Sequence, residues 1–116
     1  MKLNPTYLNP KRYPEHKIKF LEKEIQFQIL QYLTLKNILN WRNNTGALRT
    51  ERGFMRFGVP GSPDIFAVKD GKLYGIEVKR GKAKQSELQE HFGNRLLAAG
   101  ALYIVARSLD DVVAIL

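Results

Sequence analysis

An Asp-Gly pair between two apolar runs constrains the fold of this chain more than any other feature. Asp70-Gly71 separates residues 65–69 from residues 72–79, and both runs are rich in aliphatic, β-branched and aromatic residues. Such a pair is the strongest short-range signal for a two-residue β-hairpin loop, because both loop positions need positive φ. The register follows by counting outward from the loop, and it places Asp64 directly opposite Glu77.

This register has a chemical consequence at the open end of the hairpin. Directly opposed side chains have Cβ atoms about 4.5–5.5 Å apart, and like charges there destabilise the pair. Alternation along the strand also places Lys79 on the same face as Glu77. Two carboxylates held together beside a lysine predict a cation site. The alternative is structural: Asp64 caps a turn after Pro63, while Glu77 and Lys79 lie on an ordinary exposed strand.

Hydrophobic spacing outlines the elements before the hairpin. Residues 1–17 contain three prolines and several basic residues, and we expect an extended arm. From Ile18, apolar residues three and four apart predict a helix. The segment 36–44 is typical of a strand that leaves this helix, and residues 47–60 are expected to form a loop and a short strand.

The elements after the hairpin are outlined in the same way. Ser86-Glu87-Leu88-Gln89 fits a capping box that opens a second helix, and Gly100 is a natural stop for it. The apolar run 101–105 predicts a buried strand, and a brief terminal helix follows from Ser108. The apolar stripe expected on the second helix is Leu88, Phe92, Leu96 and Ala99.

Size and charge limit the function classes. A chain of 116 residues supports one domain with a single core. With no cysteine, it has no disulfide, thiolate metal site or thiol nucleophile. The net charge of +8, from 19 basic and 11 acidic residues, favours a polyanionic partner. No apolar run approaches a membrane span and no signal-peptide pattern opens the chain, so we expect a soluble protein of the cytoplasm.

The pattern Pro63-Asp64, then twelve residues, then Glu77-Val78-Lys79 resembles the signature of the PD-(D/E)xK nuclease superfamily. Within it, the chain is similar to the VRR-NUC family of small replication and repair nucleases. The resemblance implies an α/β fold with a restriction-endonuclease-like core, in which helices flank a mixed central sheet. It implies a nuclease domain at 18–116 after the arm at 1–17. The other matching landmarks are Glu24-Ile25-Gln26, Trp41-Arg42-Asn43-Asn44, Gly61-Ser62, Gly75-Ile76, and Gln89 ahead of Ala99-Gly100.

The resemblance also implies a metal site and its chemistry. Asp64, Glu77 and the Val78 backbone carbonyl would hold Mg²⁺, which Mn²⁺ would be able to replace, and Glu24 would reach the metal directly or through water. Lys79 would orient or deprotonate the attacking water. Hard divalent ions suit such oxygen donors and supply the charge stabilisation that phosphodiester hydrolysis needs.

Two of these assignments compete with other interpretations. Glu24 is preferred to Glu22, which points about 200° away around a helix of 3.6 residues per turn; a solvated surface glutamate is the alternative. The resemblance makes Gln89 a supporting residue of the site, and capping of the second helix with Ser86 is its alternative. Gln85 is a second candidate by proximity.

Basic residues near the motif predict contact with phosphates, which positions a nucleic acid without reading its sequence. Arg80, Lys82 and Lys84 follow the motif lysine directly, and Arg42 precedes the predicted hairpin. A solvated loop is the alternative for the first three. Further candidates along a DNA path are Asn43, Arg49, Arg52 and Arg56.

The resemblance implies a homodimeric, metal-dependent DNA endonuclease that acts on branched DNA such as four-way (Holliday) junctions. It implies no small-molecule cofactor and no membrane partner. Two rival functions remain open. One is a non-catalytic nucleic-acid-binding module that retains the nuclease fold, and the other is a nuclease that cleaves linear duplex DNA.

Overall fold

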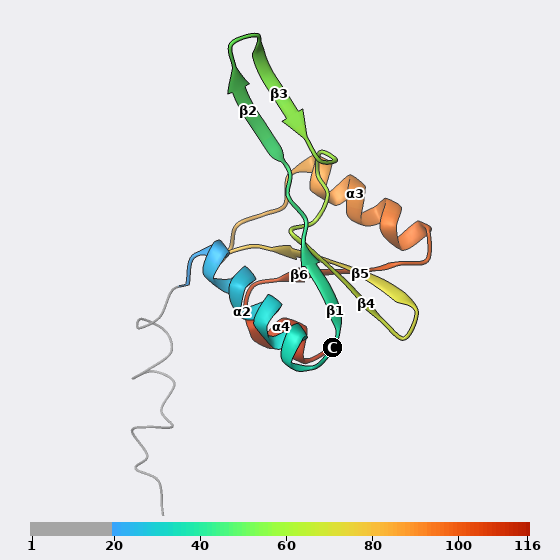
Figure 1. The fold of residues 1–116 in the computed structure, drawn as a ribbon. Helices are drawn as coiled ribbons and strands as arrows, with labels where there is room; N and C mark the ends of the chain where they lie inside the picture. Colours follow the sequence, from blue (N-terminus) through green and yellow to red (C-terminus); the bar gives the residue numbers. More distant parts are fainter. Residues whose placement is uncertain (1–19) are drawn as a thin grey trace, which may run out of the picture.

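The structure is a computed structural model that describes residues 20–116, so the arm predicted at residues 1–17 lies outside the described residues. Two helices and a terminal helical turn accompany a mixed set of strands (Figure 1). None of the helices in this part of the chain is long and apolar enough to cross a membrane. In chain order the elements are α2 (Glu22–Leu35), β1 (Leu39–Arg42), β2 (Gly46–Thr50), β3 (Gly53–Phe57), β4 (Ile65–Lys69), β5 (Lys72–Val78), α3 (Glu87–Ala98), β6 (Leu102–Ala106) and α4 (Leu109–Val113).

The central sheet has the strand order β1-β4-β5-β6. Its first three strands are antiparallel to their neighbours, whereas β6 runs parallel to β5 after the crossover through α3. Helices α2 and α4 cover one face and α3 covers the other (Figure 1). The predicted mixed sheet with flanking helices is therefore confirmed.

The β4–β5 hairpin has the predicted loop and register. Asp70 and Gly71 have φ values of 51° and 77°, as a two-residue loop of this type requires. Pairing runs from Lys69 opposite Lys72 to Ile65 opposite Ile76. The next residues outward are Asp64 and Glu77, so the β4–β5 pairing ends where the predicted site begins.

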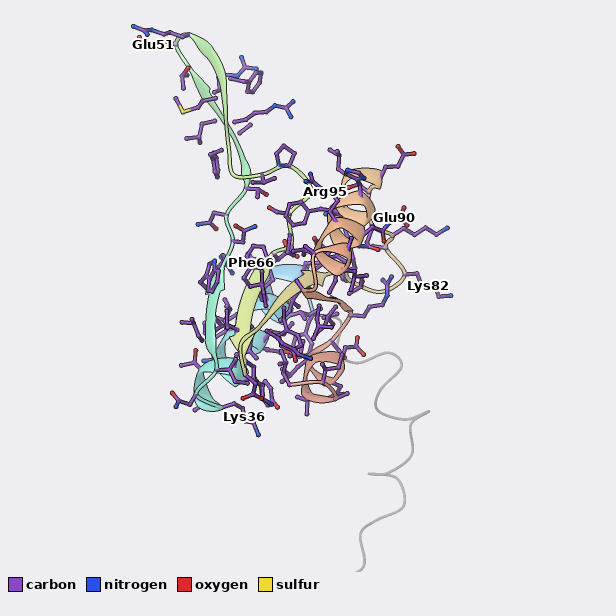
Figure 2. The ribbon with its side chains drawn as sticks, turned by 90° about the vertical axis from the view of Figure 1, so that its right-hand side faces the viewer. Lys36, Glu51, Phe66, Lys82, Glu90 and Arg95 are labelled. Atoms are coloured by element: carbon purple, nitrogen blue, oxygen red, sulfur yellow. The ribbon has the colours of Figure 1, made fainter. Side chains whose placement is uncertain are left out.

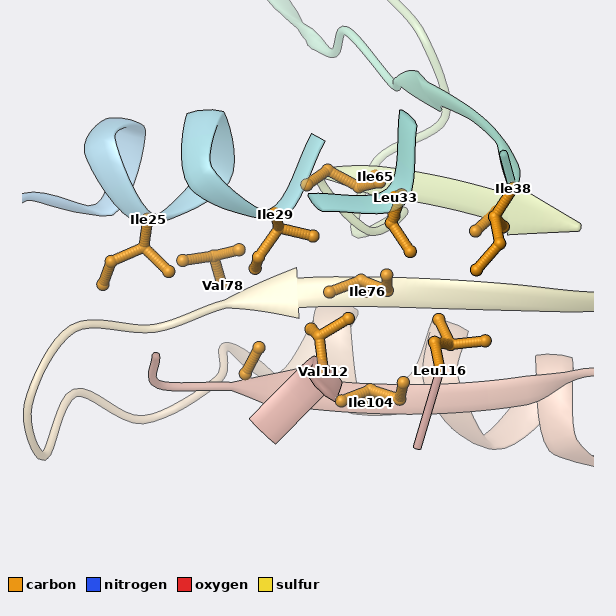
Figure 3. Close-up of a cluster of buried hydrophobic side chains, with 12 residues drawn as sticks. Ile25, Ile29, Leu33, Ile38, Ile65, Ile76, Val78, Ile104, Val112 and Leu116 are labelled. Atoms are coloured by element: carbon orange, nitrogen blue, oxygen red, sulfur yellow. The ribbon is translucent and has the colours of Figure 1, made fainter. Parts of the chain in front are cut away.

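The core lies between α2, α4 and the sheet (Figure 3). Ile25, Ile29 and Leu33 recur every four residues along α2 and present one buried stripe. Burial of each such side chain contributes about 1.5–3 kcal/mol, which fixes the rotation of α2 about its axis. The stripe packs on strand and C-terminal residues that include Ile65, Ile76, Val78, Ile104, Val112 and Leu116.

On the opposite face, α3 lies unusually close to the sheet. A Cβ atom added at Gly93 would lie 2.6 Å from the Tyr103 ring, and one added at Gly75 would lie 2.8 Å from a methyl of Leu96. The stripe predicted for this helix is only partly right. Phe92 and Leu96 are half-buried, whereas Leu88 and Ala99 are exposed and Gly93 is the buried residue.

The segment before the hairpin differs from its prediction. The strand predicted at 36–44 is restricted to 39–42, because Asn37 adopts a φ of 60° and turns the chain after α2. The loop and short strand predicted at 47–60 are a complete hairpin instead: β2 and β3 form a second sheet (Figure 1). All residues of both strands are exposed, so no burial alternation marks them. The last strand, predicted at 101–105, lies at 102–106.

Candidate active site

Asp64 lies directly before β4, and hydrogen bonds from two neighbouring strands hold it. The Asn43 backbone N–H donates to the Asp64 carbonyl at 2.7 Å, which extends the β1–β4 pairing by one residue. The Asn43 side-chain amide donates to Ser62 Oγ at 2.7 Å and to the Pro63 carbonyl at 2.9 Å. On the other side, the Val78 N–H donates to Asp64 Oδ2 at 2.8 Å. The backbone around Asp64 is therefore held from the end of β1, and its carboxylate is fixed against β5.

Glu77 lies beside Asp64 and is only 2% exposed, which contradicts the alternative of an ordinary exposed strand. Its Oε1 accepts a hydrogen bond from Gln89 Nε2 at 3.2 Å. Its Oε2 is buried and has no hydrogen-bond partner among the described residues. A buried carboxylate oxygen without a partner is costly in free energy unless a cation or proton satisfies it.

The surroundings of Glu77 favour its neutral form. Burial, followed by the charge of Asp64, raises the pKa of Glu77 from 4.5 to about 8. The Lys79 ammonium acts in the opposite direction, and the Glu22 carboxylate adds a smaller increase. Burial and the Glu77 charge also raise the pKa of the nearby Tyr103 hydroxyl to about 12. Desolvation and negative charge thus converge on one point, where a cation would be favoured.

The Val78 carbonyl leaves β5 on the side of Asp64. In an extended strand the N–H and C=O of one residue point to the same side. The Val78 N–H points to Asp64, whereas the Lys79 N–H points to the Ala106 carbonyl on β6, at 3.0 Å. The orientation of this backbone is consistent with the ligand role that the sequence implied for Val78.

Gln89 makes hydrogen bonds both at the start of α3 and to Glu77. Its Oε1 accepts from the Ser86 N–H at 2.9 Å, and Ser86 Oγ accepts from the Gln89 N–H at 3.2 Å, which completes the capping box of α3. Its Nε2 remains free to donate to Glu77. Gln85 points elsewhere and donates to the Tyr103 hydroxyl at 2.6 Å.

The structure places Glu24 away from Glu77. Glu24 is exposed, and its Oε1 accepts from the Leu21 N–H at 2.8 Å, at the start of α2. Together with Arg42 it lines a shallow groove of about 430 Å³ between α2 and the end of β1. Glu24 does not cluster with Asp64 and Glu77. Arg42, by contrast, pairs with Ile65 on β4 and therefore lies next to the Asp64 segment.

Glu22 is the helix carboxylate that acts on the site. Its charge raises the pKa of Glu77, and its Oε2 accepts from the Arg80 N–H at 3.1 Å. The reason is helical phase. Glu22 precedes Ile25, Ile29 and Leu33 by three, seven and eleven residues, so it continues the buried stripe. That spacing was present in the sequence and would have identified Glu22.

The basic loop after β5 contains the residues that were predicted to contact phosphates. Lys79 is half-buried, whereas Arg80, Lys82 and Lys84 are exposed. No sequence pattern assigned a role to Arg107, whose Nη1 donates to the Gly81 carbonyl at 2.7 Å and to the Ala83 carbonyl at 2.8 Å. No short sequence pattern links positions 24 and 26 residues apart, and only the fold brings them together.

Comparison with known proteins agrees with this architecture. No protein-family profile and no curated protein sequence matches the chain. A solved structure described as "VRR_NUC domain" matches 80% of this chain and 90% of its own, with a TM-score of 0.60 and 22% sequence identity. The chain has the fold of a VRR_NUC domain. At this identity the likeness concerns the fold alone.

The oxygen donors where the β4–β5 pairing ends suit a hard divalent cation. Within residues 20–116, no three histidine, aspartate or glutamate side chains are close enough together to hold a metal by themselves. Two carboxylates and a backbone carbonyl form instead a set of oxygen donors, which suits an ion that keeps several of its waters. The unpaired Oε2 of Glu77 fits such an ion.

The pKa of Glu77 predicts how stability depends on pH without metal. Its folded value of about 8 lies above the ordinary 4.5, so the folded state binds the extra proton between these values. This contribution to stability is complete below about pH 4.5 and is lost as pH rises through 8. In EDTA, the melting temperature of the wild type should therefore fall from pH 5 to 8 more steeply than that of Glu77→Gln. Glu87→Gln, at an exposed position on α3, is the control and should follow the wild type. Parallel curves for the wild type and Glu77→Gln would contradict the assignment.

Proposed function

We propose that the chain is a divalent-metal-dependent endonuclease that hydrolyses phosphodiester bonds in DNA. The observation that carries this proposal is the buried carboxylate of Glu77, held beside Asp64 with an unpaired Oε2. A buried carboxylate with a purely structural role would have hydrogen-bond partners for both of its oxygens, whereas Glu77 has one for Oε1 alone. A pair of carboxylates that repel each other in a buried position is instead typical of a site that binds a cation.

Each residue has a distinct part in the proposed reaction. Asp64, Glu77 and the Val78 carbonyl would hold Mg²⁺, or Mn²⁺ in its place, which supplies a polarised water and charge stabilisation at the phosphate. Gln89 fixes the orientation of Glu77 through its hydrogen bond. Lys79 orients or deprotonates the attacking water, and its ammonium offsets the charge that develops on the phosphate.

Charge supports a nucleic acid as the substrate, and DNA in particular is proposed because of the likeness to a VRR_NUC domain. The chain carries a net charge of +8, and Arg80, Lys82 and Lys84 are exposed directly after the motif lysine. These side chains would contact phosphates next to the scissile bond and position the strand without reading its sequence. Arg42 lies next to the Asp64 segment and would contact DNA that passes along the groove between α2 and β1.

Four-way junctions are the substrate structure that we propose, with a homodimer as the active form. One domain carries one Asp64–Glu77 site, so paired incision of two strands needs two copies related by a two-fold axis. Cleavage of linear duplex is the rival enzyme function. A purely binding module is disfavoured, because binding phosphates does not require a buried carboxylate pair that opposes negative charge.

Replacement of Asp64 tests the metal site directly. Asp64→Asn removes the charge but keeps the shape, and it should lower cleavage in Mg²⁺ by at least about 100-fold, as expected when a metal ligand is lost. DNA binding in EDTA should be unchanged. The control is Asp70→Asn, which makes the same chemical change in the hairpin loop, where Asn-Gly is equally suitable. Cleavage by Asp64→Asn at the wild-type rate, at matched metal concentration, would exclude the proposed site.

Lys79 and Lys82 should separate chemistry from binding. Lys79→Ala is expected to reduce single-turnover cleavage by roughly 10²–10⁴-fold, the range for loss of a positioned proton-transfer group, with little change in affinity. Lys82→Ala, in the exposed loop, should weaken binding and leave the single-turnover rate at saturation unchanged. The reverse pattern would make Lys79 a phosphate contact.

A panel of DNA structures tests the proposed substrate. Purified protein in Mg²⁺ should cleave four-way junctions faster than duplex, flap or single-stranded DNA, and light scattering should report about twice the chain mass of 13.3 kDa. A monomer that cleaves linear duplex and junctions equally well would contradict the junction proposal while leaving the metal-nuclease proposal in place.

A further inference from the structure

The β2–β3 hairpin projects away from the body of the molecule as a two-stranded ribbon (Figures 1 and 2). It consists of residues 46–57 and is called the ribbon below. Its strands pair only with each other, and every residue in both strands is exposed. Phe54, for example, is 70% exposed. The described residues therefore give the ribbon no partner that would explain its length or composition.

The ribbon has two chemically different faces. Its register pairs Leu48 with Met55, Arg49 with Phe54 and Ala47 with Arg56. Because side chains alternate across a strand, Arg49, Phe54 and Arg56 share one face, whereas Leu48 and Met55 lie on the other. The Arg49 guanidinium lies 4.8 Å from the centre of the Phe54 ring, a cation–π contact that holds it over this face. We call this the basic face.

Both legs of the ribbon are anchored beside the candidate site. The leg into β2 passes through Asn43, whose side chain and backbone bind the segment that carries Asp64. The returning leg passes through Gly61, which has a φ of 81°. A Cβ atom there would lie 2.5 Å from the Leu88 carbonyl, so this leg lies against the first turn of α3. The base of the ribbon is thus fixed relative to Asp64.

We propose that the basic face of the ribbon binds the phosphate backbone of duplex nucleic acid, several base pairs away from the bond that is cleaved. The position of that bond rests on the proposed nuclease function, whereas the binding itself does not. The ribbon contains three arginines and one acidic residue, Glu51. Arginine presents a planar fork of donors that matches phosphate oxygens, and a two-stranded ribbon is narrow enough to lie along a DNA groove.

The length of the ribbon sets its reach. Strands of five residues, at about 3.4 Å per residue, span roughly 17 Å. Duplex DNA rises about 3.4 Å per base pair, so the tip would lie about five base pairs beyond the base of the ribbon. The loop near the metal site and the ribbon would then hold the same duplex at two separate points.

A second copy of the chain is the competing occupant, and the composition of the ribbon disfavours it. Apart from small residues, the apolar face offers only Leu48, Met55 and Phe57, whereas a stable interface buries about 800 Å² on each partner. The three arginines of one ribbon would also repel those of a second ribbon packed against it. A polyanion satisfies the arginines directly.

The test is DNA binding by the full chain in EDTA, where cleavage is absent. Arg49→Ala/Arg56→Ala should weaken binding to a long duplex, and the slope of log affinity against log salt should become shallower by about 1.8, the value for two lost phosphate contacts. Arg49→Lys/Arg56→Lys should keep most of the slope. Lys36→Ala/Lys72→Ala is the control with the same change in charge: Lys36 lies at the opposite end of the molecule from the ribbon tip (Figure 2), and Lys72 begins β5 after the hairpin loop. This control should keep the wild-type slope.

Shortening the duplex tests the reach. A duplex too short to extend about five base pairs beyond the base of the ribbon should bind the wild type more weakly than a long duplex does. The same shortening should have little effect on binding by Arg49→Ala/Arg56→Ala. An equal salt slope in the ribbon and control variants would overturn the proposal. A halved mass in light scattering, specific to the ribbon variant, would assign the ribbon to contact between copies and overturn it as well. A wild type that binds DNA through the ribbon but never cleaves would refute the nuclease function alone.

Discussion

The contact between Asp64 and the end of β5 is the constraint on which the rest of the candidate site depends. Asp64 Oδ2 accepts the Val78 N–H at 2.8 Å, which sets this carboxylate against Glu77 on the neighbouring strand. Without it, burial and like charge would separate the two groups. Asn43 holds the Asp64 segment from β1, and Gln89 holds Glu77 from α3. The fold thus opposes electrostatic repulsion with hydrogen bonds from three separate elements.

The centre of this arrangement could be predicted because it is local in sequence. A two-residue Asp-Gly loop sets the register of the hairpin, and that register places Asp64 and Glu77 side by side at its open end. No contact with another element is needed to predict this. The capping box at Ser86 is local in the same sense, and it placed Gln89 on the first turn of α3. Short-range rules therefore identified the carboxylate pair and one of its hydrogen-bond partners.

The remaining parts depend on contacts that short-range rules do not contain. The choice between Glu22 and Glu24 depends on the phase of α2, which is set by the packing of Ile29 and Leu33 on the sheet. The link between Arg107 and the loop at Gly81 exists only because β6 returns parallel to β5. The ribbon was predicted only as a loop and one short strand, because both of its faces are exposed and Phe54 on the basic face interrupts the hydrophobic alternation. The differences between the sequence-based expectations and the structure thus follow from tertiary packing in two cases and from its absence in the third.

The distance between the ribbon and the Asp64–Glu77 pair bears on how such a protein would distinguish one DNA structure from another. Two carboxylates and a lysine can act on any phosphodiester bond, and phosphate contacts carry no sequence information. Discrimination between DNA structures would then have to come from geometry.

The two basic regions differ in position and direction (Figure 1). The loop at residues 79–84 leaves β5 directly after Glu77 and Val78, whereas the ribbon projects from its base beside Asp64. If both bind phosphates, affinity depends on where the DNA path lies relative to this fixed pair of contacts. A rigid base at Asn43 and Gly61 favours selection by DNA shape, since a flexible arm would accept any path.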